Sequence, residues 1–516
     1  MVHYTANQFL KGTLLSHLRT SWVAERESGA LRTDAPSSFP LARVAILFCL
    51  LLSPFRSAAG EWSAGPFAHE FSLTLVSGTR QEWLGPLYYK EVSEGQTTWA
   101  IPPFWARTVR PDVEMEEYDV LYPFLSYDRF GAEYRWHLFQ VLNFSGGQTQ
   151  DEKASDKFTI FPFYFQRRAA DPTQNYTALL PFWGTLKDRL LRDEIKIRLF
   201  PFYSRTVKKD IVTENFLFPF LHLRQGTQLE GWQFWPLMGH EHRDPFTSTN
   251  YLGIEQLTPG HDRLFIGWPF FLNSHSGVGT TNPVHQQALL PLYSHYRSPQ
   301  RDSSTYLWPF FTVTDDREKK YREWGAPWPL VAFARGEGKH MNRVWPFYSH
   351  ATNAVLTSDF ILWPLYKYNR AQAEPLDRER TRFLLFLYSD LSEKNTTTGE
   401  ARTRADLWPI FTARKELDGR ERFQLFAPLE PLVPNNKSIE RNWSPVWSVF
   451  RYEKNPVTGA ESHSILWNLL RLDTSPTNSH TSFLFGIAKR DSDEHGAKWR
   501  WFNWSSDKAK AAAGSR

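Results

Sequence analysis

The chain has 516 residues, of which 16% are aromatic and 22% charged, and its formal net charge at pH 7 is +5. A composition with 22 Trp and 40 Phe is too apolar for a disordered chain, and the lack of long apolar runs excludes a helical membrane protein. Residues 1–59 carry +3 of the net charge. The remainder is close to neutral and predicts no nucleic-acid partner.

The first recognisable pattern is the apolar run "VAILFCLLL" at Val44–Leu52. The run is about half as long as the ~20 residues that a spanning helix needs. Arg43 precedes it and "SAA" follows at Ser57–Ala59, which is the order of a secretory signal cleaved near Gly60. We therefore predict that residues 1–59 are a leader with a signal peptide. The alternative is a cytosolic protein with one buried apolar segment.

Two further expectations concern this leader. Residues 1–40 show no periodicity, and translation that begins near Leu41 or Val44 would make them a gene-model extension. Cys49 is the single cysteine of the chain and lies inside the apolar run, so the exported part would have no disulfide or thiolate metal site. The bulky Phe48 before Cys49 does not favour lipid attachment.

From Gly85 onward an aromatic-proline-aromatic core recurs, and most neighbouring prolines are 17 to 22 residues apart. Cores without proline fill the wider gaps, which gives roughly 22 units with a period near 19 residues. Examples are "LFPFYSR" at Leu199, "LWPFFTVTDD" at Leu307, "VWPFYSH" at Val344, "ILWPLYKY" at Ile361 and "DLWPIFTAR" at Asp406.

Each unit also contains one hydrophilic, turn-forming cluster, such as "DDREKK" at Asp315 or "ELDGRER" at Glu416. One core and one turn per unit predict one strand and one reversal, so consecutive strands should be antiparallel. A proline in each apolar centre would break a helix. The sequence thus predicts an all-β antiparallel meander of about 20–22 strands over residues 60–504, followed by a disordered polar tail at 505–516.

The recurring prolines raise a problem for this interpretation. A proline in the middle of a strand loses one ladder hydrogen bond, so it predicts a bulge or kink at that level. The alternative is that each proline begins the second half of a strand after a local break in that strand. The prolines that define the repeat best are Pro201, Pro309, Pro346, Pro364 and Pro409.

Two architectures fit the pattern. An outer-membrane β-barrel suits the export signal, the aromatic content and the unit length, and would be a pore, a transporter or a structural protein in contact with outer-membrane lipid. Apolar residues on both strand faces and the polar tail after Trp504 fit it less well. The alternative is a soluble exported propeller or curved β-solenoid, periplasmic or secreted, that binds carbohydrate or an envelope polymer. The oligomeric state is not predicted.

Tryptophans recur at the same place in many units. We expect them to be core or bilayer-interface residues, and an exposed row that stacks on sugar rings is the alternative. These residues are Trp235, Trp268, Trp308, Trp328, Trp345, Trp363 and Trp408.

Signals for chemistry are few. His240, His242 and Asp244 in "GHEHRD" would share one face of a strand and are a weak candidate metal site, although we expect a solvated turn there. The acid pairs Glu116/Glu117 and Asp315/Asp316 lie in hydrophilic connections, where a catalytic role is not expected. The chain has no nucleophile elbow, P-loop, dinucleotide fingerprint or HExxH pattern. We therefore predict neither an enzyme nor a cofactor.

Overall fold

The computed structural model describes residues 63–147, 155–249, 253–494 and 496–501. Within these residues 42 strands form one antiparallel sheet, and the hairpin β20–β21 forms a second, two-stranded one. The predicted all-β antiparallel meander is therefore confirmed. The predicted leader at 1–59, with Cys49, and the predicted tail at 505–516 lie outside the described residues.

The elements of the described chain are short. The helices are η1 (Gly65–Phe67), η2 (Gly85–Leu87), η3 (Pro111–Val113), η4 (Pro172–Gln174), α3 (Lys437–Asn442) and α4 (Ser444–Trp447). The strands are β1 (His69–Ser72), β2 (Gly78–Trp83), β3 (Tyr88–Ser93), β4 (Gln96–Ile101), β5 (Trp105–Arg110), β6 (Met115–Val120), β7 (Leu125–Phe130), β8 (Glu133–Leu138), β9 (Leu142–Gly146), β10 (Ser155–Ile160), β11 (Tyr164–Ala169), β12 (Tyr176–Leu179), β13 (Trp183–Arg189), β14 (Arg192–Arg198), β15 (Tyr203–Lys208), β16 (Ile211–Phe216), β17 (Leu221–Gly226), β18 (Leu229–Phe234), β19 (Met238–Arg243), β20 (Phe246–Thr249), β21 (Glu255–Thr258), β22 (Gly260–Ile266), β23 (Phe271–Val278), β24 (Val284–Leu289), β25 (Tyr293–Arg297), β26 (Arg301–Tyr306), β27 (Phe311–Asp316), β28 (Tyr321–Gly325), β29 (Val331–Gly336), β30 (His340–Val344), β31 (Tyr348–Thr352), β32 (Leu356–Ile361), β33 (Tyr366–Ala373), β34 (Leu376–Phe383), β35 (Tyr388–Asn395), β36 (Ala401–Leu407), β37 (Phe411–Lys415), β38 (Glu421–Leu425), β39 (Phe450–Asn455), β40 (Ala460–Ile465), β41 (Leu470–Thr474), β42 (Ser479–Phe483), β43 (Ala488–Asp493) and β44 (Gly496–Trp501).

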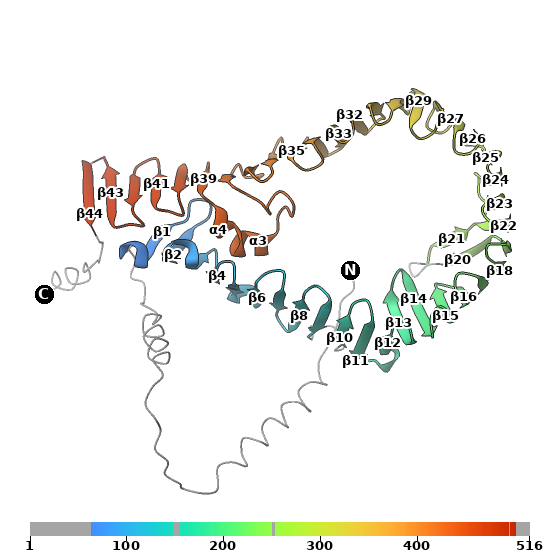
Figure 1. The fold of residues 1–516 in the computed structure, drawn as a ribbon, viewed down its shortest axis with the longest axis horizontal. Coiled ribbons are helices and arrows are strands. Elements are labelled where there is room, and N and C mark those ends of the chain that lie inside the picture. The colour runs from blue at the N-terminus through green and yellow to red at the C-terminus, as the bar shows by residue number, and fades with distance from the viewer. Residues whose placement is uncertain (1–62, 148–154, 250–252, 495, 502–516) are drawn as a thin grey trace, which may run out of the picture.

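The strands of the large sheet pair in chain order, each antiparallel to the next. One insertion interrupts this order in the described residues, where β19 pairs with β22 and the hairpin β20–β21 extends between them. Figure 1 shows that the sheet follows a wide ring, in which the first strands return to lie beside the last ones. The chain therefore forms one continuous band rather than several separate domains.

The prediction of one strand per repeat unit is wrong. Each unit is a two-stranded hairpin, because the aromatic-proline core reverses the chain as completely as the hydrophilic cluster does. For example, Tyr306 of β26 pairs with Phe311 of β27, and the core at 307–310 is the turn between them. The described chain therefore has 44 strands instead of the expected 20–22.

This arrangement explains how the sheet tolerates so many prolines. The peptide bonds before Pro201, Pro309, Pro346, Pro364 and Pro409 are cis, and all five prolines lie in the connections between strands. Proline has no N–H to donate, and in a turn no ladder hydrogen bond is lost. The predicted mid-strand bulge or kink is therefore wrong, and the predicted local break is in fact a full reversal.

The two ends of the sheet meet by overlapping and not by pairing. Strand β1 pairs with β2 and β44 pairs with β43, and no ladder joins β1 to β44, so the described sheet is not closed as a barrel. Instead, polar side chains from the last strands and their turns donate hydrogen bonds to side-chain and backbone oxygens of the first strands. Asn468 donates to Glu82 Oε2 at 2.7 Å, and Arg471 donates to the Ser72 carbonyl at 3.2 Å.

The connection between β38 and β39 is much longer than the other turns and carries α3 and α4 into this overlap. Asp119 of β6 is 1% exposed and accepts hydrogen bonds from Arg441 Nε at 2.6 Å and Asn442 Nδ2 at 2.7 Å. Tyr89 donates from its hydroxyl to the Arg441 carbonyl at 2.8 Å. A carboxylate buried at this depth is tolerated because both of its oxygens are bonded, Oδ1 by Ser438 at 3.3 Å.

Substitution of Asp119 by alanine should loosen the overlap, because Arg441 would lose a buried counter-ion. We expect the free energy of local opening to fall by about 3–5 kcal/mol. Hydrogen exchange should then accelerate in β1–β6 and in the segment from α3 to β43, while β22–β30 across the ring stays unchanged.

Asp302→Ala provides the control for this experiment. Asp302 pairs with Arg317 at 2.9 Å on an exposed part of the sheet, where an ion pair contributes about 1 kcal/mol or less. Equal exchange in the native chain and the Asp119→Ala variant would show that the overlap does not depend on this carboxylate.

Candidate functional site

The two edges of the sheet differ in composition because the two kinds of turn alternate along the chain. The polar edge is formed by hydrophilic connections such as 209–210, 317–320 and 416–420. The aromatic edge, as we define it, is formed by the connections 102–104, 121–124, 139–141, 161–163, 180–182, 199–202, 217–220, 235–237, 267–270, 290–292, 307–310, 326–330, 345–347, 362–365, 384–387, 408–410, 466–469 and 484–487.

Turns of the aromatic edge share one local geometry. In several of them a leucine with positive φ precedes the aromatic-proline pair, and the amide after the proline donates back to the leucine carbonyl. In the turn 307–310, Leu307 has φ 45° and Phe310 donates to the Leu307 carbonyl at 2.9 Å. A left-handed leucine costs roughly 1–2 kcal/mol. Such a conformation is retained only where the surrounding structure determines it.

Neighbouring turns also bond to one another. Leu217 donates to the Phe202 carbonyl at 2.8 Å, and Trp345 donates to the Leu330 carbonyl at 2.8 Å. Because this bond recurs from one hairpin to the next, the aromatic edge is a continuous surface. It is not a set of independent loops.

The aromatic edge is exposed. Phe202, Phe270, Phe310 and Phe347 keep between 52% and 61% of their surface accessible. Rows of rings also run between adjacent turns, since Trp345 and Trp363 have centroids 6.1 Å apart. An exposed apolar surface of this extent is unusual for a folded protein.

The seven tryptophans of the repeat lie on this edge. Trp235 and Trp408 are half-buried. The other five are 40% to 49% exposed, so the expectation that they are core residues is wrong for Trp268, Trp308, Trp328, Trp345 and Trp363. Their recurrence reflects the shared turn, and exposure leaves both the bilayer-interface and the sugar-stacking interpretations open.

Polarity changes along each strand and not only between its faces. Strand β27 begins with Phe311 at the aromatic edge and ends with Asp315 and Asp316 at the polar edge. Aromatic rings extend the apolar surface by one residue into the strands, as in the pair of Tyr366 and Phe383 with centroids 5.2 Å apart. We predicted strands whose centres are apolar on both faces. In the structure the apolar residues lie instead at one end of each hairpin.

The predicted histidine cluster does form, but on a strand. Residues 240–243 belong to β19, so the expected solvated turn is wrong there, and Asp262 of β22 joins the group. His240 Nε2 and His242 Nδ1 lie 3.2 Å and 3.1 Å from the Asp262 carboxylate, and Asp244 lies 3.3 Å from His242 Nε2. These contacts engage both ring nitrogens of His242 and Nε2 of His240 in hydrogen bonds. Among the described residues, no group of three or more His, Cys, Asp or Glu is arranged to hold a metal ion.

The two acid pairs are engaged by arginines of neighbouring strands. Glu116 contacts Arg107 at 2.6 Å, and Asp315 contacts Arg322 at 3.1 Å. Adjacent residues on a strand point to opposite faces, so neither pair presents two carboxylates to one substrate. The geometry favours ion pairing across strands over acid–base chemistry.

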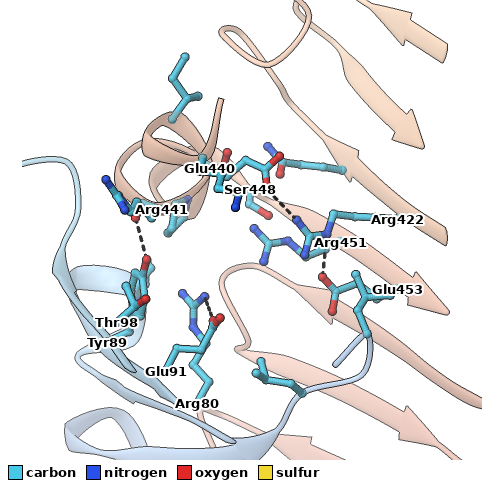
Figure 2. A pocket seen from close by; sticks show the side chains of 18 of the residues that line it. Arg80, Tyr89, Glu91, Thr98, Arg422, Glu440, Arg441, Ser448, Arg451 and Glu453 are labelled. Atoms are coloured by element: carbon cyan, nitrogen blue, oxygen red, sulfur yellow. Dashed lines mark hydrogen bonds and ion pairs between the residues drawn. The ribbon is translucent and has the colours of Figure 1, made fainter. Parts of the chain in front are cut away.

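A polar cavity of about 330 Å³ lies inside the overlap and was not predicted. Figure 2 shows arginine and glutamate side chains from both ends of the chain converging on it. Arg80 contacts Glu82 at 2.8 Å on the side of the first strands, and Arg422 contacts Glu453 at 3.0 Å on the side of the last. Glu440 of α3 accepts from Arg414 at 3.1 Å. The cavity is therefore surrounded by paired charges that come from both ends of the chain.

Burial and neighbouring charge shift the pKa values of this group. Burial alone would raise the pKa of Glu440, but Arg414 and Arg422 outweigh it and lower the pKa to about 2. Burial lowers the pKa of Arg451 to about 10, and the adjacent charge of Arg422 acts in the same direction. The carboxylate therefore stays ionised, whereas Arg451 is the guanidinium that its surroundings stabilise least.

One signal in the sequence could have indicated the cavity. Arg80 and Glu82, and likewise Arg451 and Glu453, are two residues apart, so each pair lies on one face of its strand. A charged face on both the first and the last units is consistent with two surfaces that meet. The sequence offers no register between segments more than 300 residues apart, so the contact itself could not be predicted.

Comparisons with known proteins add no assignment. The sequence matches no protein-family model, and no curated protein is significantly similar to it. None of the helices in the described part of the chain has both the length and the apolar character needed to cross a bilayer.

The overlap should weaken in acid. A carboxyl group whose pKa is lower in the folded than in the unfolded state stabilises the fold above its unfolded pKa, and this contribution is lost as pH falls through the folded pKa. For Glu440 this loss should occur between pH 4.5, which is the ordinary pKa of the group, and about pH 2, which is its pKa in the folded protein. Hydrogen exchange of α3 and β37–β39 should therefore accelerate over this window.

Glu440→Gln should reduce this pH dependence and lower the stability at pH 7, while Glu453, whose pKa is also lowered by the surrounding arginines, continues to contribute. The exposed pair Lys320–Glu337 serves as the control, because Glu337→Gln should leave the profile of the overlap unchanged. An identical acid profile for Glu440→Gln and the native chain would exclude Glu440 as its source.

Proposed function

We propose that the protein is an exported component of the cell envelope that binds the outer membrane through its aromatic edge and has a structural or transport role there. The observation that carries this proposal is the continuous, exposed row of Trp, Phe and Leu turns along one edge of the sheet. The opposite edge is hydrophilic. A molecule with this polarity has one side suited to lipid and one suited to water.

The residue types fit a bilayer interface. Trp and Tyr are enriched where membrane meets water, because each combines an apolar ring with a polar group. Leucine and phenylalanine at the tips of the turns would enter the acyl region, as in proteins that lie in the interface. The tyrosines and tryptophans near the turns would lie at the headgroup level.

Strand length distinguishes a sheet that crosses the bilayer from a sheet that inserts only one edge into it. Most strands of the described sheet have six residues or fewer, as in β26 and β27, and six residues extend over about 20 Å. The hydrocarbon core is ~30 Å thick, and a spanning strand needs ~9–11 residues. The strands reach eight residues in β33–β35. These lengths favour a sheet whose apolar edge is inserted over a sheet that crosses the bilayer.

Carbohydrate or envelope-polymer binding is the alternative function. Five exposed tryptophans favour it, since flat rings stack on sugars. Leucines that alternate with the tryptophans favour lipid, because an aliphatic side chain contributes little to sugar recognition. An affinity gel with envelope polysaccharides would show retardation if the alternative were correct.

Polar substitutions on the aromatic edge should abolish membrane binding without unfolding the sheet. Leu199, Leu217, Leu307 and Leu362 have φ between 45° and 53° and are 51% to 54% exposed. Asparagine tolerates this conformation, so Leu→Asn at these four positions preserves the turns. If each leucine loses about 1 kcal/mol of transfer free energy, partitioning to vesicles should fall by at least a hundredfold. Flotation with neutral phosphatidylcholine vesicles would measure it.

A matched control exists on the polar edge. Lys209, Gln228 and Lys320 also have positive φ, between 50° and 55°, and are exposed. Changing these three residues to asparagine introduces the same side chain in the same backbone conformation and should leave vesicle binding unchanged. The proposal would be refuted if the native chain did not float with vesicles, or if the Leu→Asn variant and the control variant floated equally. In that case, retardation by polysaccharide would support carbohydrate binding.

A further inference from the structure

The overlap cavity contains one arginine that makes no direct ion pair within the described residues. Seven arginines line the cavity, and in the described structure six of them contact a carboxylate. The six pairs are Arg80–Glu82 at 2.8 Å, Arg404–Asp406 at 2.8 Å, Arg414–Glu440 at 3.1 Å, Arg422–Glu453 at 3.0 Å, Arg441–Asp119 at 2.6 Å and Arg471–Asp473 at 2.8 Å.

Arg451 is the seventh. Within the described residues no carboxylate contacts its guanidinium, and its Nε is buried without a hydrogen-bond partner. It lies on β39 beside Arg422, and Figure 2 shows it between Arg422 and the side of the cavity formed by Arg80. Burial and the neighbouring Arg422 and Arg80 act against the charge of Arg451, and Glu453 and Glu82 oppose them without touching its guanidinium. The position therefore lacks an anion in direct contact with Arg451.

The surroundings of Arg451 suit an oxyanion. Gln424 and Ser464 are its partners on the adjacent strands, so their side chains share its face of the sheet. Ser448 and Ser462 also line the cavity and offer hydroxyl donors. Eight Arg or Lys and six Glu line the cavity, and Asp119, Asp406 and Asp473, which lie outside the lining, pair with three of these arginines. An arginine fork binds phosphate oxygens through two parallel hydrogen bonds.

We propose that the overlap cavity binds a small dianionic oxyanion of the phosphate or phosphomonoester class, with Arg451 as the principal ligand and Arg80 and Arg422 beside it. The cavity volume of about 330 Å³ is roughly that of ten water molecules in the liquid, which is enough for a phosphate group. Because the lining comes from both ends of the chain, the bound anion joins them. This site does not depend on the membrane role of the aromatic edge.

Thermal unfolding of the full chain in sodium phosphate, against sodium chloride of equal ionic strength, tests the proposal. Phosphate should raise the midpoint with a saturable dependence on concentration. Arg451→Gln should weaken phosphate binding by about tenfold or more. Arg322→Gln, which removes an 80% exposed arginine side chain from β28 across the ring, should leave it unchanged.

Stability without phosphate separates a ligand role from a structural one. Removal of an unneutralised charge should leave the phosphate-free midpoint of Arg451→Gln equal to or above that of the native chain. A lower midpoint would show that Arg451 is a structural residue and would overturn the proposal. The proposal would also be overturned if phosphate did not raise the midpoint of the native chain, or if it raised the midpoint of Arg451→Gln equally.

Competition identifies the source of the phosphate group. Water-soluble dioctanoyl phosphatidic acid should displace inorganic phosphate if the natural ligand is a lipid headgroup. Phosphate binding that this lipid does not displace would indicate free phosphate or a soluble monoester. Both results support the oxyanion site. Flotation of Arg451→Gln with phosphatidylcholine vesicles should match the native chain, which keeps this test separate from that of the aromatic edge.

Discussion

The structure depends on the fact that both connections of every repeat unit reverse the chain. A proline in an aromatic core cannot donate to a ladder, so the core forms a turn, and the apolar rings are placed at the end of a hairpin instead of between two layers. Repetition of the unit then collects these rings along one edge. The exposure of the tryptophans is thus a consequence of the local chain reversal, and the strands of the described residues form no second layer that covers them.

The same constraint explains why the ends of the sheet meet as they do. Short hairpins in a single band provide few buried apolar side chains, and the apolar clusters of the described residues are small, such as Tyr89 with Ala100 and Ala106. An overlap built from such strands cannot rely on apolar burial. It uses hydrogen-bonded charges instead, including Asp119 with Arg441 and Glu82 with Asn468. A buried ion pair stabilises weakly, but loss of one partner is costly because it leaves the other charge buried and unpaired.

Much of the fold could be predicted from the sequence. Periodicity and turn residues were sufficient for an all-β antiparallel meander, since strand and turn propensities act locally. The strand count was wrong because "LWPF" at Leu307 has the composition of a strand, whereas in the structure it is a turn that begins with a left-handed leucine. Turns of this kind bond to their neighbours, as Leu307 does to the Leu292 carbonyl, and no single unit reveals such a bond.

The candidate sites differed in how well they could be predicted from the sequence. The tryptophans were recognised because they recur, but their exposure follows from the position of the turns. The cluster around Arg451 was missed because its members are ordinary charged residues, separated by most of the chain, and become a site only where β39 meets β2 and β3. Charges that hold the ends together also surround the cavity, so a ligand there would act on the same contacts that close the band. Binding at Arg451 and the joining of the two ends are therefore coupled, since an anion that neutralises Arg451 removes the unbalanced charge from the interface it occupies.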